Sequence, residues 1–101
     1  MLNHLIEKIP DNVLLSSKAI RDVKSLHKKN SAETARVIED LIRLAKKQIP
    51  STQFKKLSGL QGLWQLDTGR YRIAFLWRGK TLYISTIFPK TSQNKIFRHM
   101  H

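Results

Sequence analysis

The stretch from Gly62 to Pro89 constrains the fold of this chain more than any other part of it. It contains three runs of aromatic and β-branched residues, separated by two short glycine-containing segments, residues 67–69 and 78–80. Runs of this kind joined by glycine turns are typical of a β-meander. We therefore predict three strands, at about residues 63–66, 70–77 and 82–88.

The two faces of the middle strand differ in character, because successive side chains of a strand point to opposite sides of a sheet. One face is apolar and is predicted to face the core: Tyr71, Ile73, Phe75 and Trp77. The other face mixes three arginines with two apolar residues: Arg70, Arg72, Ala74, Leu76 and Arg78. We expect this second face to stay open.

Arg70 and Arg72 are neighbours on that second face. Two guanidinium groups side by side repel each other unless an anion lies between them, which suggests a phosphate-bearing ligand. The alternative is that the arginines are solvated side chains of a half-exposed sheet. This alternative suits Arg70 and Arg78 better than Arg72, because Arg72 has Ala74 and Leu76 further along its face.

Positive charge is concentrated in the second part of the chain. The whole sequence has a formal charge of +12. Residues 1–40 hold seven basic and six acidic side chains, whereas residues 41–101 hold twelve basic side chains and only one acid, Asp67. Such a basic half attracts polyanions. Nucleic acid is the first candidate, an acidic protein is the second, and an anionic membrane surface fits less well.

Composition excludes several other classes of protein. The length of 101 residues suits one domain, which we take to span residues 1–101. There are no cysteines, so disulfides, thiolate metal sites and a cysteine nucleophile are excluded. No apolar run approaches the length of a membrane span. We expect a soluble, cytoplasmic protein.

The remaining segments complete an α+β fold. A short strand is predicted at residues 12–16, a helix with Ser17 as its N-cap follows through Lys29, and Asn30 suits a left-handed position at the helix end. A second helix starts at Ser31, and the two form an antiparallel hairpin. We predict that the N-terminal strand and this hairpin pack on one face of a mostly antiparallel, twisted sheet, followed by a short C-terminal helix or tail.

The residues available for catalysis indicate a cationic site without a metal or other cofactor. The four histidines lack the carboxylate or cysteine neighbours of a metal centre. No pair of carboxylates, phosphate-binding loop or nucleophile elbow is present. Cleavage of RNA by its own 2′-hydroxyl requires only cations near the phosphate and groups that transfer protons. Arg72 and Lys90 can supply the cations, because Lys90 directly follows the third meander strand.

Further residues are candidates for contacts with RNA. Trp64 and Tyr83 could stack on bases, although we favour a buried structural role for Trp64. Seven basic residues are predicted to bind the RNA backbone: Lys55, Lys56, Arg70, Arg78, Lys80, Lys95 and Arg98.

Three segments resemble the RelE/ParE superfamily of bacterial toxins, including its HigB branch. Residues 56–66 (KLSGLQGLWQL) and 69–75 (GRYRIAF) resemble the signature K-L-x-G … G-x-W/Y-x-L … G-x-Y-R-I/L-x-Y/F. Residues 17–23 (SKAIRDV) resemble the family's S-x-x-A-x-x-D-L. The similarity extends from about Val13 to Lys90, and the order of elements matches that of the family.

The resemblance implies a function and site residues. RelE and HigB members cut mRNA in the ribosomal A site without a metal, ParE members poison DNA gyrase, and an antitoxin neutralises both. Arg72 matches the family's strand arginine and Lys90 a basic position after the last strand. Leu63 and Gln65 replace two lysines of the RelE type. The histidine that ends HigB-like tails has no aligned match, and His99, our candidate, or His101 would substitute for it if the tail folds back.

We therefore expect a type II toxin that acts as a ribosome-dependent mRNA endonuclease, with the ribosome, mRNA and an antitoxin as its partners. The antitoxin is expected to carry an acidic segment that covers the basic open face or packs beside the helical hairpin. Two alternatives remain at this point. One is a ParE-like gyrase poison without nuclease chemistry, and the other is a relative that binds RNA without cutting it.

Overall fold

A computed structural model describes residues 2–57 and 62–92 of the chain. Its helices are α1 (Leu2–Glu7), α2 (Ser17–Lys29) and α3 (Ser31–Ala45), with short 3-10 helices η1 (Ser51–Gln53) and η2 (Lys90–Ser92). Its strands are β1 (Val13–Leu15), β2 (Phe54–Lys56), β3 (Trp64–Thr68), β4 (Tyr71–Arg78) and β5 (Thr81–Pro89). None of the described helices is long and apolar enough to cross a membrane.

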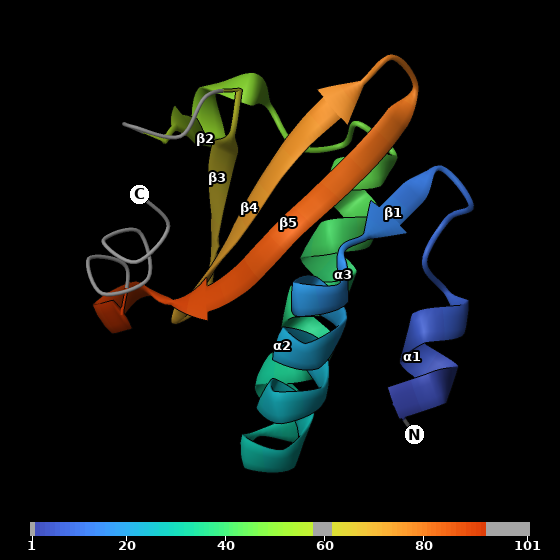
Figure 1. The fold of residues 1–101 in the computed structure, drawn as a ribbon, viewed down its shortest axis with the longest axis vertical. Helices are drawn as coiled ribbons and strands as arrows, with labels where there is room; N and C mark the ends of the chain where they lie inside the picture. Colours follow the sequence, from blue (N-terminus) through green and yellow to red (C-terminus); the bar gives the residue numbers. More distant parts are fainter. Residues whose placement is uncertain (1, 58–61, 93–101) are drawn as a thin grey trace.

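The five described strands form one mixed sheet in the order β1-β5-β4-β3-β2 (Figure 1). Strand β1 pairs with β5 in parallel, and the other neighbours are antiparallel. The predicted α+β class and the three-strand meander are confirmed, with strand ends displaced by one or two residues. Strand β2 was not predicted, because two of its three residues are lysines and it has no apolar run.

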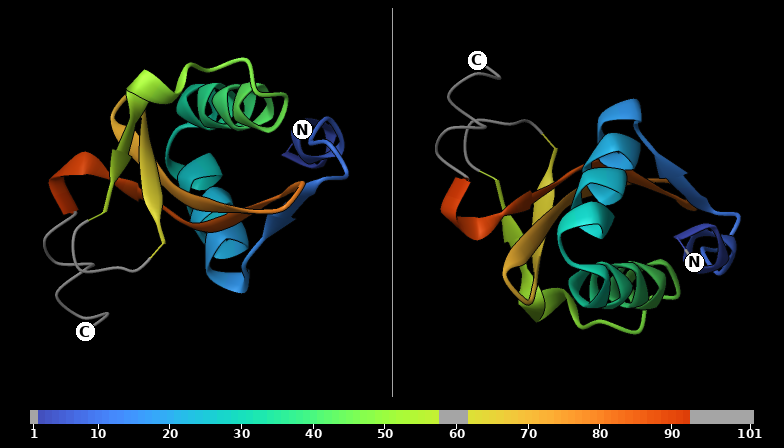
Figure 2. Two further views of the ribbon diagram at one scale, coloured as in Figure 1. Left: turned by 90° about the horizontal axis from the view of Figure 1, so that it is seen from above. Right: turned by 90° about the horizontal axis from the view of Figure 1, so that it is seen from below.

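The main core lies between the helices and one face of the sheet. Helices α2 and α3 form the predicted hairpin (Figure 1). They bury their apolar stripes against side chains such as Ile73 and Phe75 of β4, which are at most 1% exposed. The alternation of side chains in β4 therefore gives the core face that the sequence predicts. Seen from above and below, η2 lies on the opposite side of the molecule from α1 (Figure 2).

The opposite face of the sheet, here called the outer face, is less open than expected. A second small core forms there from Leu57, Ala74 and Phe88, with Leu63 packed against it. Ala74 is 0% exposed and Phe88 is 1% exposed. The expectation of a wholly open face is therefore wrong for its centre, because apolar residues from β4, β5 and the segments flanking β3 meet there.

The helix caps differ from the predicted ones, at the start of α2 in position and at its end in backbone conformation. Ser16, not Ser17, is the N-cap of α2, and its hydroxyl accepts a hydrogen bond from the Ala19 N–H at 2.9 Å. Asn30 has an extended backbone with φ −160° rather than a left-handed one. Its side chain accepts from the Glu33 N–H and caps α3 instead.

Asp22 of α2 binds the edge of β5 at the point where β1 ends. The last β1 residue is opposite Ile84, so the following residues of β5 have no partner from β1. Asp22 Oδ2 accepts hydrogen bonds from the Ile87 N–H at 3.0 Å and the Thr86 hydroxyl at 2.8 Å. One carboxylate thus satisfies two donors of a strand edge and fixes α2 against the sheet.

Candidate nucleic-acid interface

Arg72 lies on the outer face, in the middle of the antiparallel part of the sheet. It is directly opposite Asp67 of β3 and Phe88 of β5. Its Nε donates a hydrogen bond to Asp67 Oδ1 at 2.9 Å. The Arg72 side chain is 20% exposed, so it is neither behind the helices nor closed to solvent.

Lys90 reaches the same carboxylate from the end of β5. Its backbone N–H donates to the Arg70 carbonyl at 3.0 Å, which continues the β4–β5 ladder by one pair. The Lys90 Nζ lies 3.5 Å from Asp67 Oδ2, and both side chains are 39% exposed. Arg72, Asp67 and Lys90 therefore form one group, here called the Asp67 cluster. The proximity of Arg72 and Lys90 agrees with the sequence-based expectation.

Asp67 itself was given no role from the sequence. The adjacent arginines suggested an external anion, but the anion that contacts Arg72 in the structure is this carboxylate. A usable signal was present, because Asp67 is the only acid after Asp40 and lies on the far side of a short turn from Arg72. Opposite charges facing each other across a hairpin stabilise it.

An open hollow of about 410 Å³ adjoins the Asp67 cluster at Lys90. It is lined by the β3–β4 turn and the end of β5: Gly69, Arg70, Tyr71, Pro89, Lys90 and Thr91. Two of these residues, Arg70 and Lys90, are cationic, so the hollow can receive a phosphate beside the cluster. Gly69 has φ +62°, and a Cβ there would lie 3.1 Å from Glu33 Oε2 of α3, which explains glycine in this turn.

The other predicted RNA-binding cations do not all gather at this site. Arg78 and Lys80 are at the opposite end of β4, about 20 Å along the strand from Arg72 at 3.3 Å per residue. Lys55 is opposite Gln65 and shares the outer face, whereas Lys56 is opposite Trp64 and lies on the helix side. Lys95, Arg98 and His99 lie outside the described residues.

The two aromatic candidates lie on different faces. Trp64 is 40% exposed, so the favoured prediction of a buried structural role is wrong. It is directly opposite Phe75, a residue of the main core, and so belongs to the helix side of the sheet. Tyr83 is half-buried opposite Leu76 on the outer face, with the Arg78 guanidinium 5.2 Å from its ring centroid. Only Tyr83 shares the face of Arg72.

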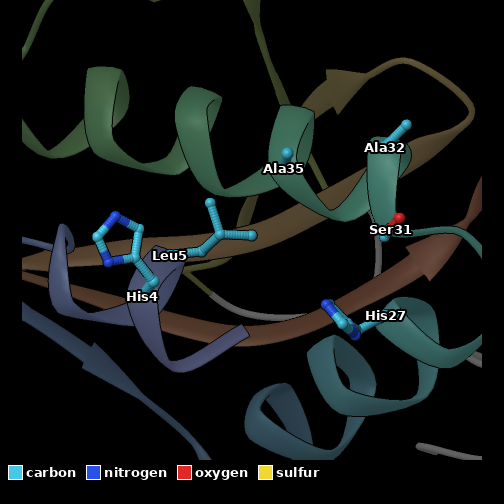
Figure 3. Close-up of a pocket in the computed structure, with 6 residues that line it drawn as sticks. All are labelled: His4, Leu5, His27, Ser31, Ala32 and Ala35. Atoms are coloured by element: carbon cyan, nitrogen blue, oxygen red, sulfur yellow. The ribbon is translucent and has the colours of Figure 1, made fainter. Parts of the chain in front are cut away.

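A second hollow, of about 660 Å³, lies among the three α-helices (Figure 3). Its walls are His4 and Leu5 of α1, His27 of α2, and small residues of α3: Ser31, Ala32 and Ala35. In residues 2–57 and 62–92, no group of three or more histidine or acidic side chains could hold a metal ion. This helical groove contains no lysine or arginine and is separate from the Asp67 cluster.

Comparisons with solved structures identify the fold. One similar structure is a RelB-RelE antitoxin-toxin complex from Methanococcus jannaschii, with TM-score 0.63, 17% identity, and coverage of 83% of this chain and 98% of that chain. Another is the RelBE2 toxin-antitoxin complex from Mycobacterium tuberculosis, with TM-score 0.64, 24% identity, and coverage of 81% and 100%. The chain has a RelE-like fold.

The RelE-like fold is also seen in a YoeB-YefM complex from Staphylococcus aureus. That match has TM-score 0.62, 16% identity, and coverage of 75% of this chain and 92% of that chain. No protein-family model and no curated protein matches the sequence. The fold that the sequence resemblance to the RelE/ParE superfamily implied is thus confirmed.

Proposed function

We propose that this protein is the toxin of a type II toxin–antitoxin system and cuts mRNA on the ribosome without a metal. The fold supports the toxin assignment, since the similar structures from Methanococcus jannaschii and Mycobacterium tuberculosis are both toxin–antitoxin complexes. The observation that carries the nuclease assignment is the meeting of Arg72 and Lys90 at one point of the outer face. The hollow lined by Arg70 and Lys90 has room for a phosphate next to Lys90.

The proposed mechanism uses the two cations as electrostatic catalysts. The 2′-hydroxyl of a nucleotide gives up its proton and attacks the adjacent phosphorus, which forms a 2′,3′-cyclic phosphate. The bond to the 5′ oxygen breaks, and that oxygen takes up a proton to leave as a hydroxyl. Negative charge grows on the non-bridging oxygens during this displacement, and Arg72 and Lys90 would stabilise it. His99, outside the described residues, remains our prediction for the group that transfers a proton.

Primer extension on mRNA tests this function. RNA is taken from cells that express the protein and from reactions with purified ribosomes held on a defined message. We expect cuts within codons positioned in the ribosomal A site, and none when ribosomes are omitted. Intact mRNA in both settings would contradict the nuclease assignment.

One observation favours a second candidate function, binding without cutting. The Arg72 guanidinium already contacts a carboxylate, so its charge is partly compensated. Among the described residues, the Asp67 cluster contains no histidine or tyrosine that could donate a proton. A ParE-like inhibitor of gyrase or an inactive RNA-binding relative would need no such group. DNA damage with unbroken mRNA would support the gyrase assignment, and ribosome binding without cleavage would support the RNA-binding one.

We further propose that an acidic segment of an antitoxin covers the outer face. Charge complementarity supports this partner, because residues 41–101 contain twelve basic side chains and one acidic side chain. The binding partner should therefore dissociate more readily as salt screens the contact. The alternative position is the helical groove beside the hairpin, whose walls include Leu5, Ala32 and Ala35 and no lysine or arginine.

Two variants separate these positions for the antitoxin. Lys55→Glu combined with Arg70→Glu reverses the charge of two exposed basic side chains. We expect this double variant to bind the antitoxin roughly tenfold or more weakly. Ala35→Trp fills the helical groove and should leave the affinity unchanged. Calorimetric titration at low and high salt measures both. The reverse pattern, or affinity that is independent of salt, would place the segment in the groove.

A further inference from the structure

The single acidic residue in the basic half of the chain contacts both cations that are proposed to bind phosphate. Residues 41–101 contain a single acidic side chain, Asp67. Its Oδ1 accepts from Arg72 Nε at 2.9 Å, and its Oδ2 lies 3.5 Å from Lys90 Nζ. Each carboxylate oxygen therefore faces a different cation, as two oxygens of a phosphate group would.

The contacts of Asp67 are open to exchange with an external anion. The Asp67 and Lys90 side chains are each 39% exposed, and Arg72 is 20% exposed. Ion pairs at this level of exposure are weakened by solvent and contribute little free energy. The carboxylate uses only the Nε of Arg72 in the contact seen here. A guanidinium has five N–H donors, and four of them are on the two Nη atoms. This Nη edge can form a bidentate contact with phosphate.

We propose that Asp67 competes with the phosphate of RNA for Arg72 and Lys90. Its carboxylate binds both cations in the free protein and releases them when an RNA strand binds. The proposal rests on the proposed function, because it assigns RNA to this site. It makes Asp67 a residue that sets the affinity for RNA. A phosphodiester must displace the carboxylate or accept its repulsion, so binding depends on neighbouring cations such as Arg70 that also attract the strand.

A purely structural role makes the opposite prediction. If Asp67 only holds the β3–β4 hairpin and keeps Arg72 in place, its removal should leave RNA binding unchanged or weaken it. If Asp67 competes with phosphate, its removal should strengthen binding. The sign of the change in affinity therefore decides between the two roles.

The experiment measures binding of a single-stranded 2′-O-methyl oligoribonucleotide, which lacks the attacking hydroxyl and cannot be cut. Asp67→Asn keeps the shape of the side chain and removes its charge. We expect its dissociation constant to fall about three- to tenfold, consistent with the loss of one partly exposed competing ion pair. The plot of log affinity against log salt should steepen by about 0.7, corresponding to one more cation available to phosphate.

Asp40→Asn is the matched control. It makes the same change in net charge and also removes an ion pair with an arginine, Arg43 at 3.4 Å, but on α3. Its affinity and salt dependence should stay close to those of the unmodified protein. Equal gains for the two variants would mean that overall charge, not the site, sets the affinity, and would overturn the proposal.

A second comparison places the effect at the cluster. In a chain that carries Arg72→Ala and Lys90→Ala, adding Asp67→Asn should give no gain in affinity. A gain that persists there would overturn the proposal, as would unchanged, weaker or undetectable binding by the Asp67→Asn protein. Melting curves confirm that each variant is folded.

Cleavage of unmodified mRNA is followed in parallel, so that the two hypotheses can fail separately. Tighter binding by Asp67→Asn without cleavage by any variant supports the competitor role and removes the nuclease function. Cleavage by the unmodified protein without tighter binding by Asp67→Asn retains the function and overturns the competitor role.

Discussion

Replacing Arg72 and Lys90 together with alanine is expected to reduce ribosome-dependent mRNA cleavage by at least about 10²- to 10³-fold. Both side chains contact the Asp67 carboxylate on the outer face, where the proposed phosphate would lie. Charge that develops on the phosphate in the transition state would then lose both stabilising cations. Cleavage rates on programmed ribosomes, measured by primer extension in single-turnover conditions, check this expectation.

A matched control separates the site from the overall charge. Arg21→Ala with Lys24→Ala removes the same charge from exposed positions of α2. This pair should lower cleavage only slightly, through weaker attraction to the ribosome. If both double variants lose activity equally, Arg72 and Lys90 have no special role. Retention of full activity by the Arg72 and Lys90 variant would remove the proposed site altogether.

Asp22→Ala is expected to lower the free energy of unfolding by about 2–4 kcal/mol, the largest loss of stability that we predict for a polar residue of this chain. The change leaves the Thr86 hydroxyl and the Ile87 N–H without their acceptor. Thr86 is 0% exposed and Ile87 is 4% exposed, so water replaces the carboxylate poorly. A loss of this size is a large part of the stability of a small domain.

Urea denaturation with matched variants measures the effect. Thr86→Val removes only one of the two hydrogen bonds and should cost roughly half as much. Asp40→Ala removes a partly exposed i,i+3 ion pair on α3 and should cost less than about 0.5 kcal/mol. Equal stability of the Asp22→Ala and Asp40→Ala proteins would show that Asp22 does not hold the sheet edge.

Regular alternation explains why most of the fold could be predicted. In β4 every second residue from Tyr71 to Trp77 faces the main core, so a periodicity of two was sufficient to place this strand. Strand β2 was missed because its three residues include two lysines and form a sheet edge, where little apolar surface is buried. Burial of apolar side chains produces the alternating pattern by which a strand is predicted, and little apolar surface is buried at such an edge.

The faces of single residues were harder to predict. Trp64 is an aromatic residue in an apolar segment, yet it is 40% exposed. It is the first residue of β3 and pairs with Lys56, the last residue of the edge strand β2, so few side chains cover it. Ala74 and Phe88 of the outer face are buried in a second small core that composition alone does not reveal. Their contacts depend on how the distant residues Leu57 and Leu63 fold back.

The candidate site was predicted in part. Arg72 and Lys90 could be named because one lies at the centre of a meander and the other directly follows it. The place of Asp67 depends on the register of β3 and β4, which sets Asp67 opposite Arg72. A shift of one residue would have turned Asp67 to the helix side, so its role required the structure.

The most direct test of the account follows the Arg72 side chain itself as RNA is added. In a nuclear magnetic resonance titration with the uncleavable 2′-O-methyl strand, the account predicts shifts of the Arg72 Nε–H signal and of the backbone amide signals of residues 67–72, Phe88 and Lys90. The amide signals of α2 should not shift. Shifts confined to the helices, with an unchanged Arg72 signal at saturating RNA, would contradict the claim that the outer face binds the strand.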